Sequence, residues 1–400
     1  MVLDSSGFSG RLGYLVPEFP QQTHIFFWRE LSAMRAMGLD VALISTKAAD
    51  SSAIKHSFAE KAAEECFYLH PVSVGALIYL ILHPLWLCRC LAYVCSLNDS
   101  LRERLKVFYL ILVSANLLNH ARHSGITHVH GHSCANSAHI LSMSQLSNQI
   151  SYSLTLHGSL GNYGSNHRKK MERAKFVSAV TKPLKEEVIQ VSGLPESKVP
   201  VISMGVDLEA FTPLNESRSR EEINFISVAR LARGKGHEYA LQALVTMKQK
   251  QYKFHYHIVG SGPYQEGIEQ QVKDLGLESY VTLHGSLGES AVLKLLLQSD
   301  VLLLTSVGNF EAAPVCVMEA MACGVPCIVS YIGGTPDMIS QGVDGFLVDQ
   351  RSVSDIENAM DEFFTNPDKL EDMSKAARVS ALEKFDYKKH AKNLVSYITS

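Results

Sequence analysis

The sequence predicts an α/β protein of two domains, each built on a parallel sheet flanked by helices. Its 400 residues exceed what one compact core usually holds. Apolar segments of strand length alternate with helical segments, and this alternation restarts in the second half. Hydrophobic residues make up 46% of the chain and charged residues 19%, which is typical of a soluble protein. The net charge of −3, without an arginine-rich run, indicates no nucleic-acid partner.

The first half begins with a strand at 13–16 and a helix at 23–37. Apolar residues recur in that helix every three or four positions, and Gly38 ends it. The same reading predicts further strands and helices along this half. The strands are 41–45, 127–130, 151–157, 176–180 and 199–202, and the helices are 105–122 and 133–146.

One segment of the first half, 72–97, is much more apolar than its surroundings. A helix that spans a membrane needs about 20 consecutive apolar residues. Pro84 divides this segment into two shorter pieces, so we expect a helical hairpin instead. The hairpin either packs on the protein or lies in a membrane interface, and the sequence leaves both alternatives open.

The cysteines indicate a reducing compartment. Most of the eight lie in apolar runs and no C-x-x-C occurs. Cys88, Cys90 and Cys95 lack a second ligand pair at zinc spacing, so no zinc site is expected. The first ten residues are polar and lead directly into a strand, unlike a secretory signal. These features predict a cytoplasmic protein.

The second half repeats the α/β pattern after a polar stretch at 211–222, which we take as a linker. The domains are therefore predicted at 1–210 and 223–380, with a final helix at 381–400. Helices are expected at 236–248 and 264–275. Strands are expected at 223–229, 254–259, 281–284, 301–305, 327–330 and 345–348.

Two carboxylates eight residues apart, Glu311 and Glu319, stand out in this half. On a helix this spacing is about two turns, so both side chains would face one way. Pro314 suits the first turn of such a helix and Gly324 its end. A strand, a short loop bearing an acid and a helix N-terminus form a common site for phosphorylated ligands. The alternative is a buried helix whose two acids cap it or form ion pairs.

Arg230 and Lys235 lie between a strand and a helix, beside glycines that permit close backbone approach. This segment has the form of an anion site, although it is no Walker A loop; a solvated basic turn is the alternative. Gly260 and Gly262 follow the next strand. They match part of a dinucleotide fingerprint, and a tight turn explains them equally well.

His157 ends an apolar strand before a glycine-rich loop, which places it to touch a ligand in an interdomain cleft. A structural histidine is the alternative. His128, His130 and His132 alternate along a strand and would share one face. They lack the aspartate of an H-x-H-x-D-H site, and the chain has no D-x-D pair, so no metal is predicted. The serine-hydrolase motif G-x-S-x-G is also absent.

Taken together, these motifs and their order along the sequence resemble those of the retaining glycosyltransferases of family 4. Enzymes of that family have the two-Rossmann (GT-B) architecture. The likeness covers nearly the whole chain and includes the segments 205–213 and 333–337. It implies two Rossmann-like domains facing a central cleft, with the helix at 381–400 crossing back to the first domain. The segment 14–25 is closest to bacterial exopolysaccharide and cell-envelope members.

The resemblance implies roles for the residues above. Arg230 and Lys235 would grip the donor diphosphate, Glu311 the sugar hydroxyls and Glu319 the ribose. His157 would line the sugar pocket. The implied catalytic residues are His157, Glu311, Arg230 and Lys235. The implied donor-binding residues are Arg230, Lys235, Gly260, Gly262, Glu311, Ala312, Ala313, Pro314, Val315 and Glu319.

The resemblance also implies a reaction without a metal or other cofactor, and front-face attack with retention. The donor would be a UDP- or GDP-sugar. The acceptor would be a glycan or a lipid-linked glycan. The apolar segment 72–97 favours a lipid-linked acceptor and peripheral contact with the inner face of the membrane. A sugar-nucleotide epimerase and a non-catalytic sugar-nucleotide binder of the same fold are the alternatives.

Overall fold

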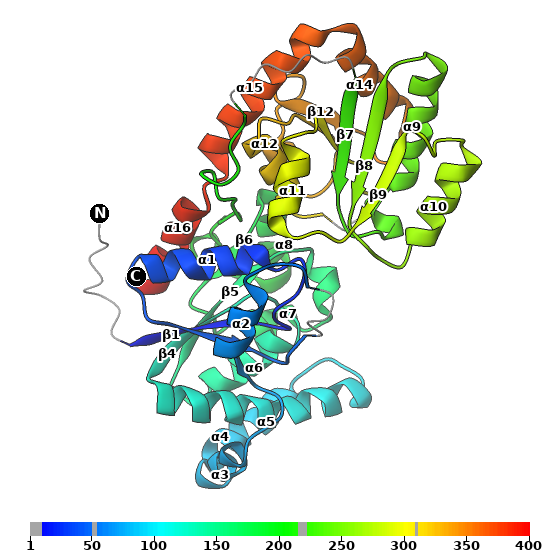
Figure 1. Ribbon diagram of the computed structural model, residues 1–400. Helices are drawn as coiled ribbons and strands as arrows, with labels where there is room; N and C mark the ends of the chain where they lie inside the picture. The colour runs from blue at the N-terminus through cyan, green and yellow to red at the C-terminus, as the bar shows by residue number, and fades with distance from the viewer. Residues whose placement is uncertain (1–9, 50–53, 215–221, 309–310) are drawn as a thin grey trace. The chain divides into compact units, whose positions relative to one another are not determined.

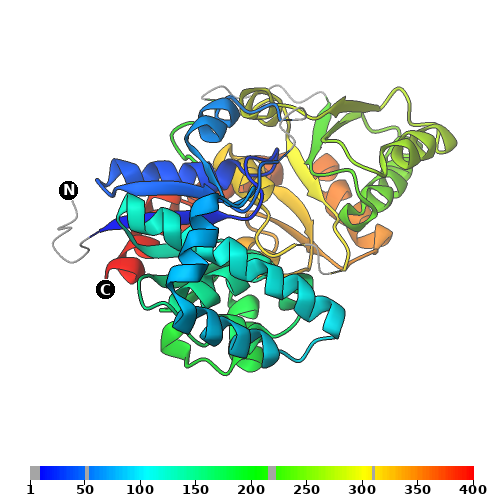
Figure 2. The ribbon, with the colours of Figure 1, turned by 90° about the horizontal axis from the view of Figure 1, so that it is seen from below.

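The computed structural model describes residues 10–49, 54–214, 222–308 and 311–400. The chain forms two compact units, the first from Met1–Ser203 with Lys388–Ser400 and the second from Met204–Tyr387. Each unit holds one six-stranded sheet. Helices cover both faces of each sheet (Figure 1; Figure 2). The α/β class and the paired Rossmann-like architecture predicted from the sequence are confirmed.

The sheet of the first unit has the order β3-β2-β1-β4-β5-β6, with all neighbours parallel. Parallel strands covered on both faces read as continuous apolar runs, and β1 and β2 are almost entirely buried. Both β2 and β4 pair with β1, so the strand order reverses between β1 and β4. The strands are β1 Arg11–Val16, β2 Val41–Ser45, β3 Phe67–Tyr68, β4 Ile126–Gly131, β5 Ser151–Leu156 and β6 Val177–Ala179.

The helices of this unit include one from the end of the chain. Leu394 and Ile398 of α16 are buried in the same core as Phe176, each contributing roughly 1.5–3 kcal/mol of apolar burial. Lys175 Nζ donates to the Ile398 carbonyl at 2.8 Å. The helices are α1 Ile25–Ala36, α2 Ala59–Glu65, α3 Val74–Leu82, α4 Pro84–Cys95, α5 Leu101–Ser124, α6 Asn136–Gln145, α7 His167–Met171, α8 Lys182–Ser192 and α16 Tyr387–Thr399.

The apolar segment forms two helices, α3 and α4, with the predicted break at His83–Pro84, but they meet at a corner instead of running antiparallel as the expected hairpin. Among the described residues no single helix is long and apolar enough to cross a membrane. Taken together, α3 and α4 pass that test of length and composition, but the pair is bent by 96°. One face of α4 packs on α6, where Trp86 Nε1 donates to the Met143 carbonyl at 2.8 Å.

The second unit repeats the topology of the first, with the order β12-β11-β10-β7-β8-β9 and all neighbours parallel. Its strands are β7 Ile223–Val228, β8 Phe254–Val259, β9 Val281–Gly285, β10 Val301–Leu304, β11 Cys327–Ser330 and β12 Gly345–Val348. Its helices are α9 His237–Gln249, α10 Gln265–Asp274, α11 Glu289–Leu296, α12 Val315–Ala322, α13 Thr335–Met338, α14 Val353–Thr365 and α15 Pro367–Lys384.

Three sequence expectations differ from the structure. The segment 199–202 makes only an isolated bridge, Ala179↔Val201, because the sheet already ends at β6. The units divide after Ser203, ahead of the predicted linker, because 204–214 packs on α15: Arg378 donates to the carbonyls of Phe211 and Leu208. Residues 215–221 of the linker lie outside the described residues. The final helix begins at Tyr387 rather than 381, since α15 runs to Lys384.

Candidate functional site

The second unit gathers the predicted donor residues at the point where its strand order reverses. β8 lies on one side of β7 and β10 on the other. The loops that follow β7 and β10 therefore leave the sheet in opposite directions and open a crevice at its carboxyl edge, where α/β proteins bind ligands. Arg230 and Lys235 belong to the first loop and Glu311 to the second. The topology thus explains why residues 76 positions apart meet.

An ion pair joins these two loops. Lys235 Nζ contacts Glu311 Oε1, and Ser306 Oγ donates to the same oxygen at 2.7 Å. The Glu311 side chain is almost fully buried, whereas the Lys235 side chain keeps 22% of its surface exposed. A second link fixes the loop backbones, because Thr305 Oγ1 donates to the Gly236 carbonyl at 2.8 Å. The result is a charged pair at the mouth of the crevice with the carboxylate on its inner side.

Helix α12 begins later than the carboxylate spacing predicts. Its first residue is Val315, with Pro314 as N-cap, so Glu311 lies in the preceding loop. The expectation that both acids face one way through helical spacing is therefore wrong, while the loop-borne acid ahead of a helix N-terminus is present. Glu319 lies inside α12 and is buried. Residues Ala312 and Ala313 complete the turn that leads into the helix.

Glycines let the neighbouring loops approach this crevice. A Cβ at Gly260, whose φ is +139°, would collide with the Ala229 carbonyl, and one at Gly262 would collide with the Leu231 carbonyl. The loops after β7 and β8 are joined there by the bond from Leu231 N to the Ser261 carbonyl, 3.0 Å long. The two glycines therefore support the loop that carries Arg230. The Arg230 side chain itself is exposed.

The segment 333–337, which leads from β11 into α13, lies on the other side of the crevice. The Gly334 N–H donates to the Ala312 carbonyl at 2.7 Å, so this loop packs on the backbone next to Glu311. Gly333 has φ +55°, and a Cβ there would collide with the Glu311 carbonyl. Four loops, each after a different strand, thus converge around the Lys235–Glu311 pair.

The first unit holds a different cluster at the corresponding point. His132 directly follows β4, and its Nδ1 lies 3.1 Å from Nε2 of His157, at the end of β5. His132 Nε2 lies 3.3 Å from Glu30 Oε1, which accepts a 2.8 Å hydrogen bond from Tyr14. The ring of Phe27 stands edge-on to His157. His157 Nδ1 is buried without a hydrogen-bond partner.

Burial decides the charges in this cluster. It lowers the pKa of His157 to about 3, with the charge of His24 as a smaller cause. It also lowers the pKa of His132 well below its ordinary value. For Glu30, burial raises the pKa to about 7, although the hydrogen bond from Tyr14 acts in the opposite direction. Both imidazoles are therefore neutral near pH 7, and one must donate to the other.

The other two histidines of β4 serve the sheet. His128 contacts Ser151 Oγ at 2.7 Å and Ser153 Oγ at 2.8 Å, and His130 contacts Ser153 Oγ at 2.7 Å and Thr155 Oγ1 at 2.9 Å. Glu30, His130 and His132 bring potential ligand atoms within 4.8 Å of one another. Because hydroxyl groups occupy both ring nitrogens of His130, this group fits a hydrogen-bond network better than a cation.

Glu30 and Tyr14 were not expected at the site. Nothing in their local sequence marks them, because Tyr14 reads as an ordinary apolar strand residue and Glu30 as a helix-surface acid. Their meeting depends on the parallel register that sets Tyr14 opposite His130. The structure shows that Tyr14 is fully buried, and the hydroxyl of a buried tyrosine usually has a hydrogen-bond partner.

Two family models match this sequence. "Glycosyltransferase Family 4" matches residues 26–210 and "Glycosyl transferases group 1" matches 214–380, so the two cover both units. The chain belongs to the family 4, group 1 glycosyltransferases. The expected family is thereby confirmed.

Among the curated relatives of this chain, some are named for exopolysaccharide biosynthesis. The putative colanic acid biosynthesis glycosyltransferase WcaL of Salmonella typhimurium is 30% identical over 211 residues, covering 52% of this chain and 52% of WcaL. The amylovoran biosynthesis glycosyltransferase AmsK of Erwinia amylovora is 33% identical over 159 residues, covering 39% of each chain. The matched segment thus spans about half or less of the length of these relatives.

Solved structures share the fold over almost the entire chain. Anabaena HepE in complex with UDP and glucose has a TM-score of 0.75 at 16% identity, covering 98% of this chain and 100% of HepE. Sucrose-phosphate synthase from Thermosynechococcus elongatus has a TM-score of 0.72 at 19% identity, covering 97% and 98%. At these identities the likeness establishes the fold alone.

Proposed function

We propose that this protein transfers a sugar from a nucleotide-diphosphate sugar to a glycan or lipid-linked acceptor, with retention and without a metal. One observation carries the proposal: in a chain of this family, the Lys235–Glu311 pair bridges the two loops of the second unit's crevice. Arg230 on the same loop and the N-terminus of α12 add positive potential there. This combination suits a diphosphate.

The ion pair gives donor binding a specific first step. An incoming diphosphate competes with Glu311 for the Lys235 ammonium, because both are anionic partners of the same cation. Once displaced, the Glu311 carboxylate can accept hydrogen bonds from donor sugar hydroxyls, while Ser306 continues to orient it. Glu319, one helix turn inside α12, is assigned to the ribose.

Bond breaking places negative charge on the departing diphosphate. Lys235, Arg230 and the first-turn amides of α12 stabilise that charge as it develops, which is the work a divalent cation does in metal-dependent enzymes. Loss of one such fixed donor costs on the order of 3 kcal/mol in the transition state. The acceptor hydroxyl attacks from the face that the diphosphate leaves and passes its proton to the departing diphosphate oxygen, so no protein nucleophile is assigned.

His157 orients the sugar as a neutral hydrogen-bonding group. Its low pKa excludes proton donation from an imidazolium near pH 7. When His132 directs Nε2–H toward ionised Glu30, its Nδ1 accepts from His157 Nε2–H. His157 Nδ1 then keeps an unused lone pair, and we assign this lone pair to a sugar hydroxyl. Glu30, His132 and Tyr14 are thus positioning residues.

The donor and the pathway are proposed by analogy. HepE was solved with UDP and glucose, and WcaL and AmsK are named for exopolysaccharide biosynthesis. We therefore expect a UDP- or GDP-hexose or N-acetylhexosamine as donor and a cell-envelope glycan as product, assembled at the cytoplasmic face of the membrane.

The test measures nucleotide release from a panel of UDP-, GDP- and ADP-sugars, with and without lipid-linked acceptor. A glycosyltransferase releases nucleotide in an acceptor-dependent way. Rapid release of nucleotide and free sugar without acceptor would instead support an epimerase of this fold. Binding of a sugar nucleotide, seen as a raised melting temperature, without release under any condition would support a non-catalytic binder.

A further inference from the structure

Helix α3 of the first unit turns an apolar face to solvent. Val74, Leu77, Ile78, Ile81 and Leu82 lie at helical spacings of three and four, and each is at least half exposed. The opposite side of the helix, with Ala76 and Tyr79, is buried. An ordinary surface helix has the reverse arrangement, with its apolar stripe turned inward.

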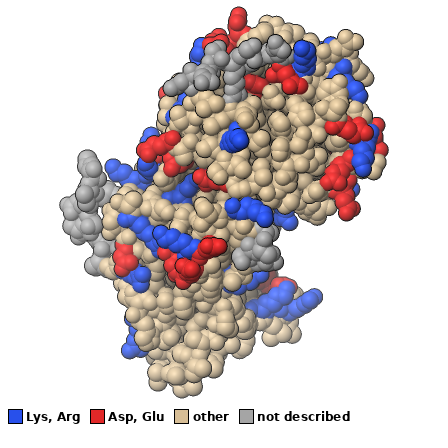
Figure 3. Space-filling model, in the orientation of Figure 1, with Lys and Arg blue, Asp and Glu red and all other residues tan. Residues whose placement is uncertain are grey.

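The exposed stripe continues around the corner into α4. Leu85, in the first turn of α4, is 77% exposed. These six residues, Val74, Leu77, Ile78, Ile81, Leu82 and Leu85, are the α3–α4 face. The part of the molecule over α3 and α4 carries very few charged side chains in the space-filling view (Figure 3). Large contiguous apolar patches of this kind mark interaction sites.

The beginning of α5 adjoins this face. The ring of Tyr109 stacks on His70, three residues ahead of the serine that caps α3. Leu101, Leu105 and Phe108 lie along the same helix at spacings of four and three, and all are more than half exposed. Ten of the eighteen exposed large apolar side chains among the described residues therefore belong to α3, α4 and α5.

Charges around the face are mainly basic. The stretch 66–98 contains no aspartate or glutamate, and Arg89 is its one lysine or arginine. Arg102 and Lys106 are exposed on the first turns of α5, where Glu103 pairs with Lys106 at 2.7 Å. A second copy of the chain would bring like charges together, whereas an anionic lipid surface would complement them.

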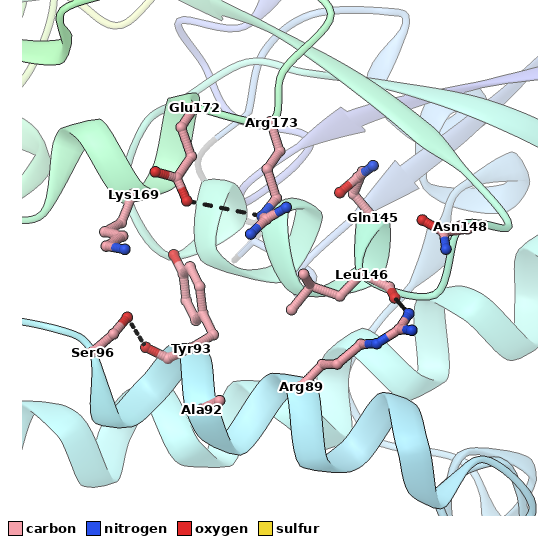
Figure 4. Close-up of a pocket in the computed structure, with 10 residues that line it drawn as sticks. All are labelled: Arg89, Ala92, Tyr93, Ser96, Gln145, Leu146, Asn148, Lys169, Glu172 and Arg173. Carbon is pink, nitrogen blue, oxygen red and sulfur yellow. Dashed lines mark hydrogen bonds and ion pairs between the residues drawn. The ribbon is translucent and has the colours of Figure 1, made fainter.

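A cavity of about 560 Å³ opens beside α4 on this side of the unit. Arg89 lies one helical turn after Leu85, so the two share a side of α4. In the close-up (Figure 4), Arg89 reaches up from α4 while Lys169 and Arg173 come from α7 and the turn after it. Glu172 is the one acid lining the cavity and lies 3.9 Å from Arg173.

This cavity is separate from the His157 cluster. Asn148, at one end of the cavity, precedes β5 by three residues, and Arg173 precedes β6 by four. They therefore lie at the edge where parallel strands begin, whereas His157 follows the end of β5. A ligand bound in the cavity does not occupy the position expected of a reacting acceptor hydroxyl.

We propose that the α3–α4 face docks on an anionic membrane surface, with α3 lying in the lipid interface and the cavity beside α4 receiving a lipid phosphate. With nine residues, α3 extends about 14 Å at 1.5 Å per residue. That is under half of the roughly 30 Å hydrocarbon core, so the helix lies in the interface rather than crossing it. Basic side chains at the rim attract anionic headgroups.

Vesicle flotation tests the docking face without any glycosyl transfer. The purified full chain is mixed with vesicles of phosphatidylcholine, alone or with phosphatidylglycerol. Ile81→Glu with Leu85→Glu places two charges on the face. The matched control is Val379→Glu with Leu382→Glu, two residues of α15 that are 54% and 50% exposed.

We expect the wild type and the control to float with anionic vesicles, and the I81E/L85E variant to bind them at least tenfold more weakly. Equal binding by all three proteins, or no wild-type binding to anionic vesicles, would overturn the proposal. Analytical ultracentrifugation gives a further outcome that would overturn it. If the wild type is a dimer, I81E/L85E is a monomer and vesicle binding is the same for both, the face is a self-association surface.

A second arm tests the cavity and distinguishes lipid phosphate from soluble phosphate. Lys169→Gln, alone and with Arg89→Gln, should reduce the preference for anionic over neutral vesicles severalfold. Glycerol phosphate is added as soluble competitor. If glycerol phosphate displaces the wild type from anionic vesicles but has no effect on the variants, phosphate alone fills the cavity. If the wild type keeps its preference for anionic vesicles in the presence of glycerol phosphate and the variants lose that preference, the lipid context is required. An unchanged preference in both variants would refute the cavity site.

Discussion

The two units share one topology and differ in the chemistry that it presents. In each, the first strand lies between the second and the fourth, so a crevice opens at the same place. The second unit fills this place with opposite charges and close-packed glycine loops around Lys235 and Glu311. The first fills it with the neutral rings of His132 and His157 and with Glu30, an acid whose pKa is raised by burial. The fold therefore sets the location of a site, and the loop residues set its ligand.

The largest expected effect tests the charged half of this comparison. Lys235→Ala should reduce kcat/KM for the donor by roughly 100- to 1,000-fold, since one cation aimed at the leaving group contributes about 3–4 kcal/mol. Steady-state kinetics with saturating acceptor measure it. Lys273→Ala, an exposed lysine of α10, is the control and should match the wild type. Equal kinetics for K235A and K273A would remove Lys235 from the reaction.

The pH dependence of stability tests the Glu30 cluster of the first unit. Because the folded pKa of Glu30 lies above its unfolded value, protonated Glu30 stabilises the fold fully below about pH 4.5, and this contribution is lost as pH rises to about 7. Glu30→Gln removes the titration. The stability of E30Q relative to the wild type should therefore rise between pH 4.5 and 8, by up to about 3 kcal/mol.

Urea unfolding at several pH values measures this difference, with the exposed Glu64→Gln as control. The buried histidines act oppositely: His157 contributes stability above its unfolded pKa that is lost as pH falls toward 3. The absolute stability of every variant should thus fall in acid, and only the E30Q difference isolates Glu30. A flat difference from pH 4.5 to 8 would contradict its assignment as a buried acid.

A smaller effect compares glycines in the two units. Gly260→Ala meets both a left-handed φ and the Ala229 carbonyl, whereas Gly193 in the first unit has φ +70° with open space around it. We expect G260A to cost about 1–3 kcal/mol and to raise the donor KM, and G193A to cost about 1 kcal/mol without a kinetic change. Thermal unfolding and kinetics measure both. Identical effects would mean that the loop packing beneath Arg230 is not needed.

Removal of metal ions is expected to have no effect on turnover. If fixed cations neutralise the diphosphate, dialysis against EDTA should leave turnover within about twofold of the untreated enzyme. Complete loss of activity that Mg²⁺ or Mn²⁺ restores would show that charge neutralisation in the second unit needs a metal.

Much of the second unit was predictable because its chemistry is local. Lys235, Gly260 and Glu311 each lie in a loop that directly follows a strand, no more than seven residues beyond its end, and parallel strands bring such loops together. The helix expected around Glu311 was wrong because Pro314 caps α12 and leaves the acid outside. The spacing of residues along the sequence does not show whether Glu311 lies in the helix or in the loop before it.

The His132–His157 cluster of the first unit was less predictable, because its residues meet only through the register in which the strands pair. Tyr14, Glu30 and His132 come from a strand, a helix and a loop, and meet only after β1 pairs with β4. The two apolar helices and the break between them were predictable from composition and Pro84, whereas the 96° corner in place of a hairpin was not. Which face would stay exposed depended on how α3 packs, which composition does not encode.

The most direct test of the account is calorimetric binding of UDP and GDP to the wild type, Lys235→Ala and Glu311→Gln. We expect K235A to bind the preferred nucleotide at least tenfold more weakly than the wild type, because the diphosphate loses its cation. E311Q should bind as tightly as the wild type or more so, because Glu311 no longer competes for Lys235. Equal weakening in both variants, or none in K235A, would contradict the proposal that the diphosphate displaces Glu311 from Lys235.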